Sequence, residues 1–224
     1  MAANTIAYQQ ILQELIASNT TLIAVSKTKP VEDILQLYHL GQRDFGENYV
    51  QELVDKAAQL PAGIHWHFIG HLQKNKAKYI APFVYLIHGV DSLSLLTEIN
   101  KQAKKNNRVI DCLLQVYITN EITKFGLNKS ELINILNTIL STSENFQYIR
   151  IRGLMGMAGF TDNAAQIEAE FTYLRQLFDN CKVQFPQFAQ FNFLSMGMSG
   201  DYKMAIACGS NMVRIGSLLF GSRS

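Results

Sequence analysis

The stretch Leu22–Ser26, with the sequence Leu-Ile-Ala-Val-Ser, is a short apolar run, and residues Val31–Leu40 after it have the periodicity of a helix. The same succession recurs along the chain. An apolar or β-branched run that alternates with a longer helical segment is typical of βα units, which build a parallel sheet. The eight runs that we expect to form strands are Leu22–Ser26, Asp44–Gly46, His65–Gly70, Leu86–Val90, Ile110–Ile118, Arg152–Met157, Asn192–Met198 and Met212–Gly216.

The segments between these runs have apolar residues three and four positions apart, as amphipathic helices do. Ser130 and Asp162 stand near the start of two such segments, and short polar side chains there accept bonds from free backbone N–H groups. The helical segments are Val31–Leu40, Tyr49–Gln59, Leu93–Asn106, Ser130–Leu140 and Ala164–Asn180. An extra helix is predicted before the first strand. Its apolar face would consist of Ile6, Leu12, Leu15 and Ile16.

Eight βα units within 224 residues predict an α/β fold with one (β/α)8 barrel, known as a TIM barrel. An open doubly wound sheet commonly uses five or six strands and fits less well. No Ser/Gly/Pro-rich stretch divides the chain, so we expect a single domain over residues 1–224. The hydrophobic fraction of 48% against 17% charged residues supplies a large core and excludes intrinsic disorder.

The charge balance is nearly neutral, with 20 basic and 18 acidic residues. A formal charge of +2 is too small for the electrostatic attraction on which nucleic-acid binding depends, so no nucleic-acid partner is expected. The basic segment 101–108 is interpreted as a solvated helix end, and it is the only feature that favours an RNA- or partner-binding scaffold.

Three features point to a reduced, cytoplasmic location. Cys112, Cys181 and Cys208 are odd in number and widely separated, so we expect free thiols rather than disulfides. The first Lys or Arg is Lys27, so the N-terminus lacks the basic residues of a secretory or mitochondrial leader. No apolar run approaches the ~18 residues of a membrane helix, so we expect no membrane partner. We also expect a monomer.

The carboxyl ends of the strands form the binding face of such a barrel, and Lys27 directly follows the first run in Ala24-Val25-Ser26-Lys27-Thr28-Lys29-Pro30. Most lysines at strand ends are simply solvated. A lysine whose amine is desolvated at the mouth of a site can instead form a Schiff base with an aldehyde.

The seventh and eighth runs are followed by glycine and hydroxyl residues. Ser199 and Gly200 come after one run, and Gly216 and Ser217 after the other. Small residues let the backbone approach an anion, while N–H and hydroxyl groups donate to it. Barrels often hold phosphate after these two strands, so the pattern predicts a phosphate site.

Arg214 interrupts the apolar run Met212–Gly216 in a strand that should be buried. A buried guanidinium requires acceptors to offset its desolvation. Two interpretations remain open, namely an ion pair with a carboxylate of a neighbouring strand and a donor to the ring nitrogen of a pyridine cofactor.

His65 and His67 face the same way on the third run, and His71 follows it. A zinc site is conceivable, but neither a carboxylate nor a cysteine is expected nearby to complete a ligand set. Packing and site-lining roles are therefore the favoured interpretation, and no metal is predicted.

The ordered motifs resemble those of the pyridoxal phosphate homeostasis proteins, which are barrels similar to the N-terminal domain of alanine racemase. The motifs are Ala24-Val25-Ser26-Lys27-Thr28-Lys29-Pro30, Phe45-Gly46-Glu47-Asn48-Tyr49-Val50-Gln51-Glu52, Trp66-His67-Phe68-Ile69-Gly70 with Leu72-Gln73, Gly153-Leu154-Met155, Leu194-Ser195-Met196-Gly197-Met198-Ser199, and Val213-Arg214-Ile215-Gly216 with Phe220-Gly221. The resemblance spans nearly the whole chain.

This resemblance implies a cofactor and a role for each site residue. Lys27 would hold pyridoxal 5′-phosphate (PLP) as an internal aldimine. Arg214 would meet the pyridine nitrogen, and Asn48 and Met198 would line the pocket. The residues that would bind the phosphate are Ser199, Gly216 and Ser217. Tyr117 stands where the family usually has asparagine, whereas Glu121, Lys124 and Gly126 keep the family's spacing.

The resemblance also implies a carrier of PLP that serves cellular homeostasis, with PLP-dependent apoenzymes as acceptors and no strong catalysis. An arginine at the pyridine nitrogen disfavours ring protonation and so weakens the electron sink of the cofactor. The alternatives are a PLP-dependent amino-acid racemase-like enzyme, with a Tyr or His as its second acid/base, and a Schiff-base aldolase without a cofactor.

Overall fold

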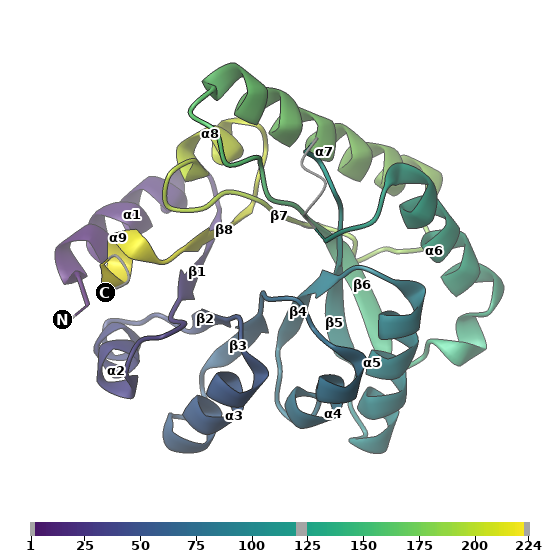
Figure 1. Cartoon of the computed structure of the whole chain (residues 1–224), viewed down its shortest axis with the longest axis horizontal. Helices are drawn as coiled ribbons and strands as arrows, with labels where there is room; N and C mark the ends of the chain where they lie inside the picture. Colours follow the sequence, from purple (N-terminus) through teal and green to yellow (C-terminus); the bar gives the residue numbers. More distant parts are fainter. Residues whose placement is uncertain (1–2, 120–124, 222–224) are drawn as a thin grey trace.

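A closed barrel of eight parallel strands is formed in the computed structural model, which describes residues 3–119 and 125–221 (Figure 1). Each strand pairs with the next along the chain, and β8 pairs with β1 to close the barrel. The strands are β1 (Thr21–Val25), β2 (Asp44–Glu47), β3 (His65–Phe68), β4 (Leu86–Val90), β5 (Ile110–Gln115), β6 (Ile149–Met155), β7 (Phe193–Ser195) and β8 (Met212–Ile215). The prediction of a (β/α)8 barrel is confirmed.

Helices surround the barrel on its outer side (Figure 1). They are α1 (Thr5–Ala17), α2 (Val31–His39), α3 (Val50–Gln59), α4 (Ala77–Ile80), α5 (Leu93–Lys105), α6 (Lys129–Ser141), α7 (Ala164–Gln184), α8 (Tyr202–Ala207) and α9 (Ser217–Phe220), with 3-10 turns η1 (Lys74–Lys76) and η2 (Ser143–Asn145). The extra N-terminal helix α1 packs against α9, so the two ends of the chain lie side by side. Among the described residues, no helix is both long and apolar enough to cross a membrane.

Two apolar layers hold the barrel together. A small cluster fills its interior, and a larger one lies between the strands and the surrounding helices. The interior cluster consists of Ile23, Leu86, Leu113, Met155 and Met212. Cys112 and Cys181 are buried in the outer layer, Cys208 is partly exposed, and all three are free thiols.

The apolar face predicted for α1 is wrong in part. Ile6 and Ile16 are 70% and 77% exposed, whereas Tyr8, Ile11 and Leu15 are buried. The buried side chains follow one stripe at the spacing i, i+3 and i+7, and Ile6 and Ile16 fall outside it. Apolar residues thus occur on both faces of this helix, so periodicity alone selects the wrong set.

The caps predicted for two helices are also wrong. Asn128 caps α6, where its side chain accepts from the backbone N–H of Glu131 and Glu131 bonds back to Asn128. Asn163 caps α7 by accepting from the N–H of Gln166. Ser130 and Asp162 lie within two residues of these caps, and the helices begin where an asparagine reaches the free N–H groups.

Four predicted strands run two or three residues too far at their carboxyl ends. β3, β5, β6 and β7 end at Phe68, Gln115, Met155 and Ser195, before the predicted ends at Gly70, Ile118, Met157 and Met198. The residues beyond each strand remain apolar because they line the mouth of the barrel or pack beneath it. Hydrophobicity therefore does not mark where these strands end.

Arg108 departs from the solvated helix end that we expected for the segment 101–108. Its guanidinium donates to the backbone carbonyls of Ala81 (2.7 Å) and Val84 (2.8 Å). The lysines of the segment are exposed at the end of α5. Arg108 is thus a structural contact to the segment that precedes β4.

Candidate functional site

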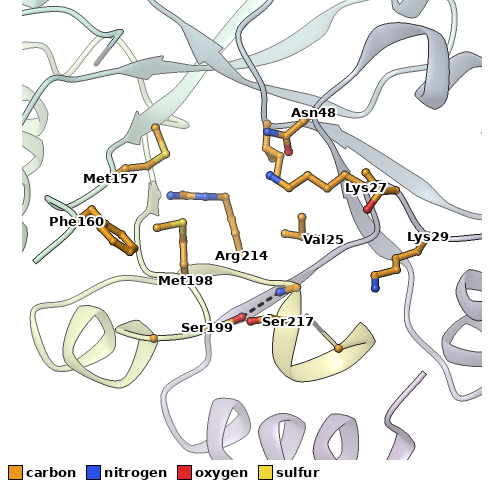
Figure 2. Close-up of a pocket in the computed structure, with 15 residues that line it drawn as sticks. Val25, Lys27, Lys29, Asn48, Met157, Phe160, Met198, Ser199, Arg214 and Ser217 are labelled. Carbon is orange, nitrogen blue, oxygen red and sulfur yellow. Dashed lines mark hydrogen bonds between the residues drawn. The ribbon is translucent and has the colours of Figure 1, made fainter. Parts of the chain in front are cut away.

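A cavity of about 470 Å³ opens at the carboxyl end of the barrel (Figure 2). Ligand sites are commonly found at this face, and the volume is in the range of small-molecule pockets. All seven site residues predicted from the sequence line this one cavity, namely Lys27, Asn48, Met198, Ser199, Arg214, Gly216 and Ser217. Sequence reasoning did not single out four apolar lining residues, Val25, Ile69, Met157 and Phe160.

Lys27 lies two residues beyond the end of β1, on the same side of the backbone as Val25, which also lines the cavity. Figure 2 shows its side chain extending towards the middle of the group of lining residues. Lys29 lines the cavity as well. The structure therefore brings two primary amines to the mouth, and Lys27 is the one that follows directly from the strand end.

The backbone before Lys27 is held by buried charged groups. The Ser26 hydroxyl donates to Glu47 Oε1 (2.6 Å), and Lys56 Nζ donates to the Ser26 carbonyl and to Glu47 Oε1, both at 2.7 Å. Burial raises the pKa of the Glu47 carboxyl, although Lys56 and Ser26 act against this rise. This contact fixes Ser26 on one side of Lys27.

Lys56 also holds the backbone after Lys27, in this case through the carboxylate of Glu52. Thr28 has a φ of 63°, a left-handed conformation that is uncommon for a residue other than glycine. Its backbone N–H donates to Glu52 Oε1 (2.5 Å), and Glu52 forms an ion pair with Lys56 at 2.7 Å. Sequence reasoning noted Glu47 and Glu52 only as parts of a motif, because their link to Lys27 depends on Lys56 one turn later in α3.

Ser199 and Ser217 lie together at the foot of the cavity, after β7 and β8 (Figure 2). The backbone N–H of Gly216 donates to the Ser199 hydroxyl at 3.2 Å. Among the described residues, the N–H groups of Ser217 and Leu218 at the start of α9 have no acceptor. Two hydroxyls and these N–H groups provide the donors that an anion requires.

Arg214 enters the cavity from β8 and is only 4% exposed. Its Nη1 donates to the carbonyl (2.9 Å) and hydroxyl (2.6 Å) of Ser195, and its Nη2 donates to the carbonyl of Gly156 (3.0 Å). Burial lowers the pKa of Arg214 to about 10, so the guanidinium remains charged at neutral pH. Within residues 3–119 and 125–221, no carboxylate forms an ion pair with it, which removes the structural ion pair considered above.

Asn48 and Met198 complete the walls. Asn48 follows β2, and its buried side-chain oxygen has no hydrogen-bond partner among the described residues. Gly70 packs so closely on the Asn48 backbone that a Cβ atom there would collide with it. Met198 is 40% exposed at the rim. A polar ligand in the cavity would provide the partner that the Asn48 amide lacks.

The sequence predicted no carboxylate near the histidines of the third strand, and this prediction is wrong. His65 Nδ1 and His67 Nε2 both contact Asp44 Oδ1, at 3.1 Å and 3.0 Å, because Asp44 lies beside them on β2. His71 contacts Asp91 instead. In the described part of the chain, no group of three or more His, Cys, Asp or Glu residues could hold a metal.

Tyr117, which replaces the family's usual asparagine, is not among the described residues that line the cavity. Its backbone N–H donates to the carbonyl of Leu127 at 3.0 Å. Glu121 and Lys124, whose spacing matches that of the family, lie outside the described residues.

Comparison with known proteins places this chain in a family. The pattern of the alanine racemase N-terminal domain matches residues 3–224. A pyridoxal phosphate homeostasis protein of Pasteurella multocida is 42% identical over 209 residues, which cover 92% of this chain and 88% of the relative. The chain is a member of the pyridoxal phosphate homeostasis protein family. The protein of that name from Escherichia coli K12 is 38% identical over 210 residues, covering 91% of this chain and 86% of the relative.

Solved structures agree with this membership. The structure of PipY from Synechococcus elongatus PCC7942 without PLP has a TM-score of 0.85 at 36% identity, covering 93% of this chain and 99% of PipY. PipY with PLP bound has a TM-score of 0.81. Alanine racemase from Bartonella henselae, with covalently bound pyridoxal phosphate, has a TM-score of 0.69 at 17% identity. It covers 97% of this chain and 59% of the racemase, so it supports the fold alone.

Proposed function

We propose that this protein binds PLP in the cavity at the carboxyl end of the barrel and holds it for PLP-dependent apoenzymes. The observation that carries the proposal is the convergence of Lys27, a charged Arg214 and the Ser199–Ser217 donors on one cavity. These three features match an aldehyde, a pyridine nitrogen and a phosphate. The names of the relatives and the PipY structure with PLP support the same assignment.

Each part of the cavity fits one part of the cofactor. When bound, PLP would supply an aldehyde, a group that reacts with a primary amine. Lys27 provides that amine at the end of β1. Ser199 and Ser217 would bind the phosphate through their hydroxyls, and Gly216 would donate its backbone N–H in place of its bond to Ser199. Arg214 would donate to the ring nitrogen, and the unpartnered Asn48 Oδ1 would accept from a donor group of the ligand.

A holding function suits these residues better than turnover. A charged arginine at the pyridine nitrogen keeps that nitrogen unprotonated, which weakens the capacity of the ring to stabilise a carbanion. Among the described residues that line the cavity, none has a carboxyl, imidazole, thiol or phenol group, and the second amine, that of Lys29, follows the same strand as Lys27. A racemase-like reaction would need such a group opposite the lysine.

A visible absorption spectrum of the purified protein with and without added PLP tests this function. We expect a band that is distinct from that of free PLP, together with transfer of the cofactor when a PLP-dependent apoenzyme is added. A protein that stays colourless but cleaves a phosphosugar would be an aldolase. Rapid exchange of the α-proton of an amino acid for deuterium would identify a racemase. Either result contradicts a holding function.

A further inference from the structure

A chain of polar side chains crosses the otherwise apolar interior of the barrel. It begins at Arg214, which lines the cavity, and ends at Asp44, the first residue of β2. The linking atoms are Arg214 Nη1 and Ser195 Oγ (2.6 Å), His88 Nδ1 and Ser195 Oγ (3.1 Å), His67 Nδ1 and His88 Nε2 (2.9 Å), and His67 Nε2 and Asp44 Oδ1 (3.0 Å). His67, His88 and Ser195 are at most 1% exposed.

The donors and acceptors allow only one direction along this chain when both imidazoles are neutral. The ionised Asp44 carboxylate can only accept, so His67 donates to it from Nε2 and its bare Nδ1 accepts. His88 therefore donates from Nε2 to His67 Nδ1, and its own bare Nδ1 accepts from the Ser195 hydroxyl. The Ser195 oxygen still accepts from Arg214, which can only donate. Both histidines are thereby fixed as the tautomer that carries its proton on Nε2.

The charges along the chain agree with this direction. Burial lowers the pKa of His88 well below its ordinary value, and the neighbouring His67 and Arg214 lower it further. Burial also lowers the pKa of His67, although Asp44 acts against this effect. Burial would raise the pKa of Asp44, but its bonds to His67 and His65 outweigh burial and lower it. Two neutral imidazoles and a serine therefore join a guanidinium cation to a carboxylate anion.

The hydrogen-bonded chain leaves some N–H groups of the Arg214 guanidinium available to a ligand. Of its five N–H donors, Arg214 directs two to Ser195 and one to the carbonyl of Gly156. Among the described residues, the Nε hydrogen and one Nη2 hydrogen have no acceptor. Their direction is set by the three bonds that the other hydrogens make.

We propose that Ser195, His88, His67 and Asp44 are positioning residues that hold Arg214, as a charged donor, towards the ring nitrogen of the ligand. This inference rests on the function proposed above. It extends the site from the cavity to the opposite end of the barrel, to residues that cannot touch the ligand. Protonation of the imidazole pair would turn His88 Nδ1 into a donor to Ser195 and add a cation beside Arg214, so cofactor binding weakens in acid.

The first test needs no cofactor. Nitrogen-15 NMR of the histidine rings in the complete protein at pH 7 should show both His67 and His88 as neutral rings protonated on Nε2. A ring protonated on Nδ1, or a ring carrying two protons, would overturn the direction of the chain. Because this measurement is independent of PLP, its outcome is separate from that of the proposed function.

The second test measures the PLP dissociation constant and the pH dependence of the bound spectrum in Ser195→Ala and Asp44→Asn. His39→Gln, on the outer surface of α2, is the matched control. We expect affinity to fall about fivefold in Ser195→Ala and about threefold in Asp44→Asn, because charge-assisted hydrogen bonds in a network support one another. Both variants should also change the pH dependence of the absorption spectrum of bound PLP.

Asp44→Asn keeps the shape of the side chain, and Asp44 is the partly exposed last member of the hydrogen-bonded chain from Arg214. This variant therefore remains informative if Ser195→Ala does not fold. Wild-type affinity and an unchanged pH profile in the folded variants would show that the chain is merely structural. A wild-type protein that binds no PLP would instead refute the proposed function and leave the NMR result standing.

Discussion

Lys56 Nζ lies 2.7 Å from Glu47 Oε1 in a buried ion pair, and the same nitrogen bonds the carbonyl of the residue before Lys27. The pair thus joins α3 to the end of β2 and to the loop after β1. Glu47 is fully buried, so its carboxylate depends on Lys56 and Ser26 for compensation. A single lysine side chain therefore supports both the stability of the barrel and the position of Lys27.

Lys56→Met should lower the free energy of unfolding by about 3–5 kcal/mol, because it leaves the Glu47 carboxylate buried without its cation. Urea denaturation measures this loss. Lys203→Met is the matched control. It removes an exposed partner of Glu14, and it should destabilise the protein far less than Lys56→Met does. A loss in Lys56→Met no larger than in the control would show that the buried pair does not stabilise the fold.

Lys27 should carry the phosphopyridoxyl group after borohydride reduction of the protein loaded with PLP. Peptide mapping by mass spectrometry locates the group. Lys29→Ala is the matched control, because Lys29 lines the same cavity, and it should keep the modification. Recovery of the group mainly on Lys29, Lys74 or Lys203 would make the assignment of Lys27 wrong.

Replacing Ser199 and Ser217 together by alanine should weaken PLP binding at least tenfold, since each hydroxyl bond to a charged phosphate contributes ~1.5–3 kcal/mol. Fluorescence titration measures the dissociation constant. Ser130→Ala, on the exposed side of α6, should bind like the wild type. An unchanged constant in the double variant would move the phosphate site elsewhere.

Arg214→Gln should keep most of the denaturant midpoint of the cofactor-free protein, with a loss below about 2 kcal/mol. Glutamine keeps a hydrogen-bond donor at this position, and no carboxylate among the described residues is stranded. The PLP affinity or the bound spectrum should change, because the ring nitrogen loses a charged donor. A loss of several kcal/mol with an unchanged spectrum would make Arg214 a structural residue.

The sequence was sufficient to predict those parts of the molecule that depend on local patterns. Lys27, Ser199 and Arg214 could be assigned to one site because the carboxyl ends of parallel strands meet at one face of a barrel. The contact between Asp44 and His67 could not be predicted, because it joins residues 23 positions apart whose pairing depends on strand register. The link from Lys56 to the Lys27 loop was also missed, since it requires α3 to place Lys56 against both Glu47 and the Ser26 carbonyl.

Helix starts were predicted less well because several polar residues compete near each one. Asn128 and Ser130 both precede or open the same helix, and only the backbone geometry decides which side chain reaches the free N–H groups. The chain across the barrel illustrates the same limit at longer range. His88 and Ser195 gave no local signal, and they acquire a role only because β4 and β7 face each other across the interior.

The free energy of unfolding should fall as the pH decreases below 6.5, the ordinary value from which the pKa values of His67 and His88 are lowered by burial. The unfolded chain then binds protons that the folded protein still excludes, so stability is fully present above 6.5 and is lost as the pH falls towards the folded pKa values. Each excluded proton contributes a slope of about 1.4 kcal/mol per pH unit. The pKa of Glu14, Glu98 and Asp44 is lowered from 4.5 or less, so these carboxyls act below this window. Urea denaturation between pH 7.5 and about 5.5 measures how the free energy of unfolding changes with pH. This slope should be smaller in His88→Gln than in the wild type or in the control His39→Gln. Equal slopes in all three proteins would show that His88 is not the group excluded from protonation.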